Sequence, residues 1–444
     1  MAILRAVTAG TGGIAKRPRR GDPLTEENRY LVWMAGVSWD GIRGTDRHMV
    51  TAMACHARIL WVDPPLSPVR AALLRSTTHY TPRPEISVVN RQVTRLTPKA
   101  MPGLSRPGIR VTTAALVRLQ TRWALRRLGI QPFAVVATYP GDLLGYWGGN
   151  VVNVFYGTDD YVAGAELMGL SARYQLRQEI RIVSQADVVA AVSPQLAERW
   201  AGFGASPVVI PNGCWAIKAG ERVVLPKPKD LTHPVVGLIG QLSDRIDLPV
   251  LNAIADAGLS LLIVGPLDPR WEQQQRFKEL VNKPHVYYTG PVPAEALPSY
   301  LAAIDIGITP YRDTPFNRAS FPLKTLEYLG AGIPVVSADI PAARWLRADL
   351  TRGEQARWAD RIMVLASDGA DFVSAIRRIA ASDSPSAPGG GFPNMVAEDP
   401  TRAGQCIAFA ARHTWERRAN SFASVIGLAP QAPGQSGELL CRLP

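Results

Sequence analysis

The stretch P-F-N-R-A-S-F-P-L-K-T-L-E-Y-L-G-A-G-I-P-V-V-S-A-D, at residues 315–339, contains a loop, a helix and a strand in immediate succession. The Pro-Leu-Lys turn at residues 322–324 predicts the start of the helix, and residues 335–337 form a short apolar strand. The first amides of a helix have no partner within it and attract anions. Lys324 adds a positive charge there, and the carboxylate of Glu327, one turn further on, can accept hydrogen bonds from sugar hydroxyls. The segment therefore predicts a nucleotide site.

Strands alternate with helices over most of the chain. Apolar segments typical of buried strands occur at residues 30–37, 59–62, 133–138, 151–155 and 188–192, and again at 235–239, 261–264, 286–288, 306–309 and 335–337. Helical patterns lie among the first set at residues 47–58, 172–185 and 194–200. This alternation implies mostly parallel sheets covered on both faces. We predict an α/β fold with two doubly wound, Rossmann-like domains that face each other across a cleft.

The predicted domain limits follow composition. We expect a first domain at residues 29–213, a linker rich in Pro and Lys at 214–234, and a second domain at 235–382. The remaining segments are a disordered basic tail at 1–28, an irregular Pro/Gly/Ser-rich loop at 383–404, a closing helix at 405–426 that returns to the first domain, and a mobile tail at 427–444.

Composition narrows the class of protein. The chain has 444 residues, of which 47% are hydrophobic, and no apolar run reaches the length of a membrane span. Its first twenty residues lack the apolar core of a secretory signal, so we expect a cytoplasmic location. The four cysteines and six histidines are scattered, which predicts neither a disulfide framework nor a metal site.

The net charge of +12 favours anionic partners. Nucleotide diphosphates, anionic lipids and nucleic acid all qualify, as does the simpler interpretation of a solvated basic surface. No aromatic-basic RNA motif or helix-turn-helix pattern is present, so nucleic acid is not expected. The segment at residues 105–127 carries six arginines around Leu116, Leu119 and Trp123. It is either a surface helix that covers a sheet or a peripheral contact with the anionic inner face of the cell membrane.

Two loops of the first domain carry candidate binding groups. The loop W-D-G-I-R-G-T-D-R-H at residues 39–48 follows the first strand, and its glycines would let the backbone approach a ligand. Its candidate acceptor-side residues are Gly41, Gly44, Asp46, Arg47 and His48, although Asp46 would equally serve as a helix cap. The segment Y-G-T-D-D-Y at residues 156–161 follows another strand, where Asp159 and Asp160 suit hydrogen bonding to a sugar or a capping turn.

Residues 30–420 resemble the GT-B-fold retaining glycosyltransferases, in the glycosyl and mannosyl transferase group 1-like family. The resemblance rests on an ordered series: V-I-P-N-G at 209–213, the strands and turns at 235–240, 261–266, 288–293 and 304–311, and the stretch at 315–339. The Pro-Leu-Lys…Glu-Tyr-Leu pattern is similar to a branch that includes enzymes proposed for teichuronic acid synthesis.

The resemblance implies a set of site residues. Glu327 would hold the ribose hydroxyls, and the amides of Leu323 and Lys324 would meet the diphosphate. The nucleotide positions it implies are Gly240, Gln241, Gly265, Gly290, Pro322, Leu323, Lys324 and Glu327.

The chain also departs from the family pattern. A second Glu of the family motif is replaced by Ala319, its Arg by Gln241 and its Lys by Ile246. Arg245, Arg318 and Lys324 together would then neutralise the phosphates, or the enzyme would be weak or altered. The candidate catalytic residues are Lys324, Arg245 and Asp159.

The implied function is a hexosyltransferase that moves a sugar from a nucleotide-sugar donor to a glycan or lipid-linked acceptor, in cell-envelope or exopolysaccharide synthesis. Retention of anomeric configuration is the family default, and neither cofactor nor metal is expected. Two alternatives stay open: a nucleotide-sugar epimerase of the same fold, and a non-catalytic subunit that binds nucleotide-sugar or glycan.

Overall fold

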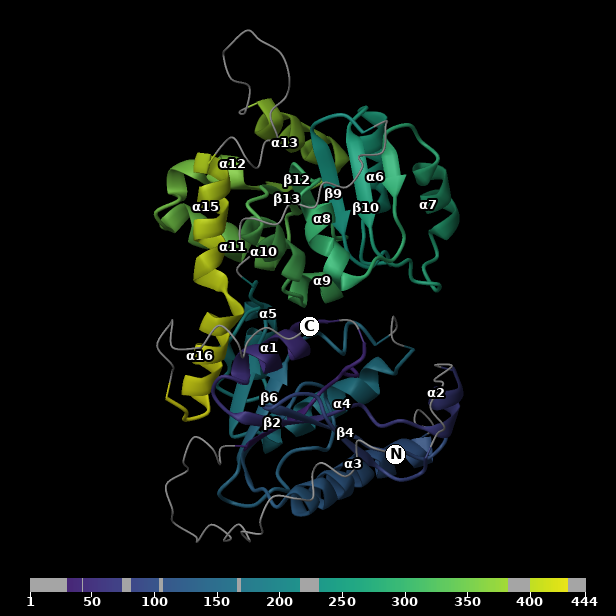
Figure 1. Cartoon of the computed structure of the whole chain (residues 1–444), viewed down its shortest axis with the longest axis vertical. Helices are drawn as coiled ribbons and strands as arrows, with labels where there is room; N and C mark the ends of the chain where they lie inside the picture. The colour runs from purple at the N-terminus through teal and green to yellow at the C-terminus, as the bar shows by residue number, and fades with distance from the viewer. Residues whose placement is uncertain are drawn as a thin grey trace, which may run out of the picture.

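The structure is a computed structural model that describes residues 30–41, 43–73, 81–103, 107–165, 169–215, 231–381 and 400–429. Two parallel-rich sheets, each with its own helices, form two Rossmann-like domains stacked along the long axis of the molecule (Figure 1). This confirms the predicted α/β class and the doubly wound architecture. The predicted tail at 1–28 and most of the predicted linker, loop and C-terminal tail lie outside the described residues.

The N-terminal sheet has eight strands among the described residues, all parallel except the antiparallel edge pair β3 and β4. Their order across the sheet is β3 (Glu85–Val88), β4 (Val93–Thr97), β2 (Arg58–Val62), β1 (Tyr30–Met34), β5 (Pro132–Ala137), β6 (Val152–Gly157), β7 (Val188–Ala191) and β8 (Val208–Val209). Its helices are α1 (Thr45–Met53), α2 (Pro68–Leu73), α3 (Pro107–Leu128), α4 (Ala172–Gln185) and α5 (Pro194–Ala201).

The C-terminal sheet has six parallel strands among the described residues. Their order is β11 (Val286–Tyr288), β10 (Ser260–Val264), β9 (Val235–Ile239), β12 (Ile306–Thr309), β13 (Val335–Ala338) and β14 (Met363–Ala366). Its helices are α6 (Leu248–Asp256), α7 (Gln274–Val281), α8 (Leu297–Leu301), α9 (Pro315–Ala319), α10 (Leu323–Gly330), α11 (Pro341–Arg352), α12 (Ala359–Ile362) and α13 (Gly369–Ala381).

Sequence patterns missed four strands: β3, β4, β8 and β14. Strand β3 has no fully buried residue, and β8 is two residues long, so neither shows the apolar run that identifies a buried parallel strand. Nine of the ten predicted strands agree with the observed ones because they are largely buried and read as near-continuous apolar runs, while β11 was found although it is only partly buried.

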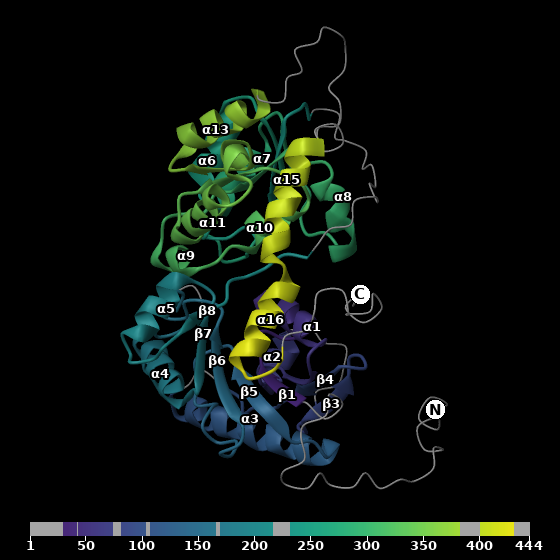
Figure 2. The same cartoon turned by 90° about the vertical axis from the view of Figure 1, so that its left-hand side faces the viewer.

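The predicted closing helix is two helices. Helix α15 (Pro400–Ala410) lies on the C-terminal domain and α16 (Trp415–Val425) lies on the N-terminal domain beside α1 (Figure 2). Thr414 separates them, since its extended backbone caps α16 and its hydroxyl accepts from the amide of Arg417. Residues 400–404, predicted as irregular, belong to α15. Among the described helices, none is long and apolar enough to cross a bilayer.

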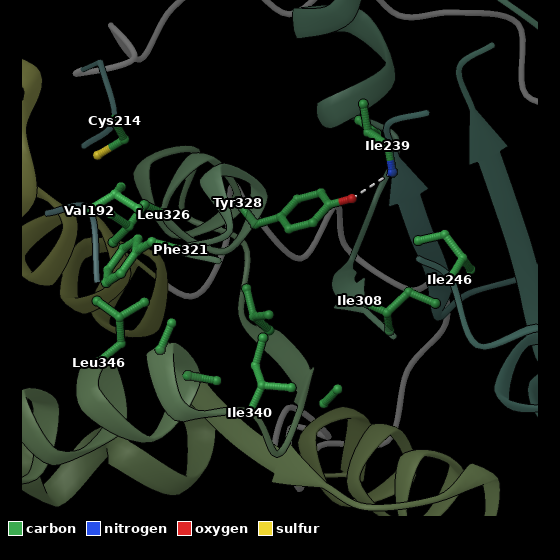
Figure 3. Packing of buried hydrophobic residues seen from close by; sticks show 14 of the residues in the cluster. Val192, Cys214, Ile239, Ile246, Ile308, Phe321, Leu326, Tyr328, Ile340 and Leu346 are labelled. Atoms are coloured by element: carbon green, nitrogen blue, oxygen red, sulfur yellow. Dashed lines mark hydrogen bonds between the residues drawn. The ribbon is translucent and has the colours of Figure 1, made fainter. Parts of the chain in front are cut away.

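Helix α10 is seated on the C-terminal sheet by a buried tyrosine. The Tyr328 hydroxyl accepts from the amide of Ile239 at 2.7 Å and donates to the carbonyl of Gly237 at 3.2 Å (Figure 3). Both partners lie on β9. The ring passes over Gly307 on β12, where a Cβ would lie 2.5 Å from Cγ of Tyr328. These two hydrogen bonds, with the buried side chains of Leu326 and Leu329, hold α10 on the sheet.

We predict that Tyr328→Phe lowers the free energy of unfolding by about 1–3 kcal/mol, because it leaves the buried Ile239 amide without a partner. Urea denaturation measures the change. Tyr287→Phe is the matched control, since that ring is 42% exposed and should shift the midpoint little. Equal midpoints for the two variants would contradict the role given to the Tyr328 hydroxyl.

Candidate functional site

Lys324 and Glu327 lie together at the N-terminus of α10. Pro322 is the N-cap residue, and the Lys324 ammonium forms an ion pair of 2.5 Å with the Glu327 carboxylate. The two side chains are 26% and 29% exposed. Because a partly exposed ion pair of this kind contributes little to stability, a ligand can take over either partner at small cost. The pair lies at the helix start where the sequence predicted a phosphate and a ribose.

Three predicted glycines line the carboxyl ends of β9, β10 and β11. A Cβ on Gly265 would lie 2.0 Å from the carbonyl oxygen of Gly240, and its φ of 140° favours glycine. The Gly265 amide donates to the carbonyl of Gly290 at 3.0 Å. A Cβ on Gly240 would meet Cε of Lys324 at 4.0 Å. The glycines and the start of α10 therefore form one continuous surface.

The residues that depart from the family pattern are engaged elsewhere. Ile246 is 4% exposed and belongs to the core, so it cannot face a phosphate. The Gln241 amide lies 3.5 Å from the carboxylate of Asp268. Ala319 is buried, and its carbonyl accepts from the Ser193 hydroxyl of the N-terminal domain at 2.5 Å. This position has become part of the contact between the domains.

Arg245 is held at the domain boundary. Its Nε donates to Asn317 Oδ1 at 2.9 Å, and its guanidinium lies 5.3 Å from the Tyr311 ring and 4.9 Å from the Phe316 ring. The terminal guanidinium nitrogens donate to no residue that the structure describes. Arg318, in contrast, is turned outward into an exposed ion pair with Asp313 at 2.5 Å. Only Arg245 of these two arginines is therefore available to a ligand at the boundary.

Asp46 is a buried structural carboxylate. It accepts from Thr138 Oγ1 at 2.9 Å, from the Gly36 amide at 3.1 Å and from Trp33 Nε1 at 3.4 Å. Gly44 is the N-cap residue of α1, so the alternative of Asp46 as a helix cap is wrong. Burial raises the pKa of Asp46 to about 6, although its hydrogen bonds act in the opposite direction. It ties α1 to the ends of β1 and β5 and is not free to meet an acceptor.

The other residues of the 39–48 loop form its scaffold. The Gly41 amide donates to the carbonyl of Ser38 at 2.9 Å. Arg47 donates to the carbonyl of Trp39 at 2.5 Å and lies 4.4 Å from the centre of the Trp39 ring. Burial lowers the pKa of Arg47, and the neighbouring Arg43 and Arg95 lower it further. The loop therefore presents positive charge at the boundary.

Asp159 and Asp160 are adjacent in the sequence, but their carboxylates have different surroundings. Asp160 is buried and accepts from Arg199 at 2.8 and 2.9 Å, so it is an internal structural group and not an acceptor contact. Asp159 makes no hydrogen bond with any described residue. Burial raises its pKa to about 6, while the charge of Arg245 in the other domain favours the ionised form. Asp159 thus lies opposite Arg245 at the boundary.

Asn212 links the N-terminal domain to the segment before α10, a role that the sequence did not predict. Its Oδ1 accepts from Thr45 Oγ1, at the start of α1, at 2.8 Å. Its Nδ2 donates to the carbonyl of Phe321, just before α10, at 2.6 Å. The signal in the sequence was its place in the V-I-P-N-G segment at 209–213, which was predicted to lead out of the N-terminal domain. A side-chain amide that is buried there needs hydrogen-bond partners, and the two domains supply them.

His48 also lies at this junction. Its Nδ1 accepts from Trp215 Nε1 at 2.7 Å, and its ring stacks on Trp415 with 5.3 Å between centres. Burial is the main cause that lowers the pKa of His48 to about 4. The charge of Glu327 raises this pKa, and the charge of Lys324 lowers it. The structure therefore places His48 beside the two charged groups of α10, although the sequence assigned it to the acceptor side.

The predicted basic helix is α3, which covers the N-terminal sheet through Val117, Ala124 and Leu125. Arg118 binds Asp142 at 2.8 Å, and Arg122 donates to the carbonyl of Tyr146 at 2.6 Å. The outer face exposes Leu119 (58%), Trp123 (43%), Arg126 and Arg127. The side chains of Arg106 and Arg110 lie outside the described residues. In the described part of the chain, no cluster of three or more His, Cys, Asp or Glu could hold a metal ion.

Comparisons with known proteins agree with this geometry. Residues 234–382 match the family model Glycosyl transferases group 1. A segment of 110 residues is 38% identical to the Bacillus subtilis (strain 168) protein named "Putative teichuronic acid biosynthesis glycosyltransferase TuaH". That match covers 24% of this chain and 27% of the relative, so the chain spans about a quarter of the relative's length.

Solved structures resemble almost the whole chain. Sucrose-phosphate synthase from Thermosynechococcus elongatus superposes with a TM-score of 0.64 and 17% identity over 90% of this chain and 98% of that one. An E. coli trehalose-6-phosphate structure bound with UDP-2-fluoro glucose gives a TM-score of 0.61 and 12% identity over 90% and 100% of the two chains. This chain therefore has the GT-B fold, and the domain at residues 234–382 is similar to the glycosyl transferases of group 1.

Proposed function

We propose that this protein is a glycosyltransferase that moves a sugar from a nucleotide-sugar donor to a glycan or lipid-linked acceptor. The observation that carries the proposal is the Lys324–Glu327 pair at the N-terminus of α10, beside Gly240 at the end of β9. Glu327 would accept from the ribose hydroxyls, and Lys324 with the first amides of α10 would bind the diphosphate. The protein's own contribution is then positioning and electrostatic stabilisation of the leaving phosphate.

The acceptor would approach from the N-terminal domain. Asp159 is the carboxylate there that no described residue engages, and it faces Arg245 across the boundary. We assign Asp159 to the acceptor hydroxyl and Arg245 to the phosphate side. Retention of configuration, hexosyl transfer and a role in cell-envelope or exopolysaccharide synthesis complete the proposal, supported by the resemblance to the family and by the name of the Bacillus relative.

Donor profiling tests the proposal. The folded protein is heated with UDP-, GDP- and ADP-sugars, because a nucleotide that binds only the folded state raises its melting temperature by mass action. The stabilising donor is then incubated with and without membrane extract as a source of acceptors. Transfer that requires the extract supports the proposal. Conversion of the sugar without an acceptor identifies an epimerase instead, and binding without turnover identifies a binding subunit.

Glu327→Ala is expected to weaken nucleotide binding by at least about tenfold, because hydrogen bonds to a charged group contribute about 1.5–3 kcal/mol. The variant should stay folded, since Glu327 is partly exposed and its side chain pairs with Lys324 alone among the described residues. Calorimetry with the stabilising nucleotide measures the affinity. Glu279→Ala, on the exposed side of α7, is the matched control. Unchanged binding by folded Glu327→Ala would remove the ribose assignment.

Lys324→Ala is expected to lower kcat/KM by about a hundredfold or more, because negative charge on the leaving phosphate grows in the transition state. Arg245→Ala should lower it less, since Asn317 and two aromatic rings hold that side chain away from α10. Arg318→Ala, which breaks only an exposed ion pair with Asp313, should match the wild type. Steady-state kinetics that place Arg245→Ala below Lys324→Ala would reverse the two roles, and wild-type rates for both would exclude this site.

We further propose peripheral contact with anionic membrane through the outer face of α3. Leu119 and Trp123 are exposed beside Arg126 and Arg127, a combination suited to the interface of an anionic bilayer. The double change Arg126→Gln/Arg127→Gln should weaken binding to phosphatidylserine vesicles roughly thirtyfold at low salt, at about 1 kcal/mol per charge. The matched control is Arg377→Gln/Arg378→Gln on α13. Wild-type protein that does not sediment with these vesicles would exclude the contact.

A further inference from the structure

The ring of His48 is held in one orientation and one protonation state by two tryptophans from distant segments. Trp215 Nε1 lies 2.7 Å from His48 Nδ1, and the Trp415 ring stacks on the imidazole with 16° between the planes. An indole N–H can only donate, so Nδ1 must accept. The proton of the neutral ring is therefore on Nε2, which makes that atom a hydrogen-bond donor.

The Nε2 atom has no hydrogen-bond partner among the residues that the structure describes. His48 is partly exposed, so a ligand can approach its ring. A donor that is oriented by two aromatic side chains and still unused is suited to a ligand. Packing alone would not require the Trp215 hydrogen bond.

His48 lies next to the start of α10. Thr45, one turn earlier on α1, is linked through Asn212 to the carbonyl of Phe321, immediately before α10. Leu323, the first residue of α10, packs against the hydrophobic cluster that contains Trp415. The charged groups that act on the ring are Arg43 and Arg47 from its own loop and helix, and Glu327 and Lys324 from α10.

The chemistry of the site calls for such a donor. The two positions at which the family pattern has an Arg and a Lys carry no cation here, because they are Gln241 and Ile246. Gln241 lies near Asp268, and Ile246 is buried. A neutral N–H adds stabilisation to a diphosphate without placing another cation beside Arg43, Arg47 and Lys324. His48, on the first turn of α1, is a group of the N-terminal domain that offers such a donor.

We propose that His48 donates a hydrogen bond from Nε2–H to the diphosphate of the nucleotide-sugar donor, and so binds the donor from the N-terminal domain. This inference rests on the proposed function of the α10 site. It moves His48 from the acceptor side to the donor side. Trp215 is then a positioning residue, since it acts on the nucleotide only by fixing the tautomer of His48.

A matched pair of variants tests the proposal. In His48→Gln the side-chain amide reaches the place of Nε2 and can donate there. In His48→Asn the shorter side chain reaches only the place of Nδ1, so it can accept from Trp215 but leaves nothing at Nε2. Calorimetry with UDP, and with GDP and ADP in the same format, should show about tenfold weaker binding for Asn and a loss of no more than about threefold for Gln.

Nuclear magnetic resonance of the imidazole nitrogens supplies a readout that packing would not move. Wild-type His48 should show the single Nε2–H tautomer between about pH 6 and pH 8, and adding UDP should shift the Nε2 signal more than the Nδ1 signal. In Trp215→Phe the freed Nδ1 should allow both tautomers.

The outcomes separate this inference from the proposed function. If Glu327→Ala weakens UDP, GDP or ADP binding and His48→Asn does not, the His48 contact is overturned and the nucleotide site stands. If Gln and Asn weaken binding equally, or UDP leaves the Nε2 signal unmoved, stacking on Trp415 explains the residue and the proposal fails. If wild-type protein binds none of the three nucleotides, the proposed function fails, and this inference fails with it.

Discussion

The Tyr328 hydroxyl fixes α10 on the C-terminal sheet, and the candidate site depends on that helix. Strand β9 extends beyond its pairing with β12, so the Ile239 amide has no strand partner on that side, and the tyrosine supplies one at 2.7 Å. The first turn of α10, with Lys324 and Glu327, is thereby held over Gly240 at the end of β9. A polar contact in the core thus positions the charged groups at the surface.

Backbone and side-chain hydrogen bonds at the boundary between the domains also position the start of α10. The chain crosses it twice, and the crossings pair with each other: the Cys214 amide donates to the carbonyl of His413, and the Trp415 amide donates to the carbonyl of Cys214. Asn212, two residues before Cys214, links α1 to the segment before α10. Because these contacts are polar and directional, they fix where the N-terminal loops meet the start of α10.

The hydrogen-bond partners of the carboxylates in the N-terminal domain distinguish structural groups from candidate functional groups. Asp46 and Asp160 are buried and engaged, by an amide, an indole N–H and a hydroxyl in the first case and by Arg199 and two amides in the second. Asp159 is adjacent in sequence to Asp160, but it makes no hydrogen bond within the described chain and faces Arg245. Adjacent residues at the end of a strand point to opposite sides, so one serves the core and the other serves the boundary.

The sequence by itself determined the two parallel-rich sheets and predicted the start of α10 as the nucleotide end of the site. Buried parallel strands read as apolar runs, and Lys324 and Glu327 are one helical turn apart, so both follow from local spacing. Only the tertiary structure showed the edge strands, the break between helices at Thr414 and the different surroundings of Asp159 and Asp160. It also showed that Ile246 is buried and that His48 lies near α10. The place of His48 depends on partners more than a hundred residues away, Trp215 and Trp415, and no local pattern records which distant groups will meet.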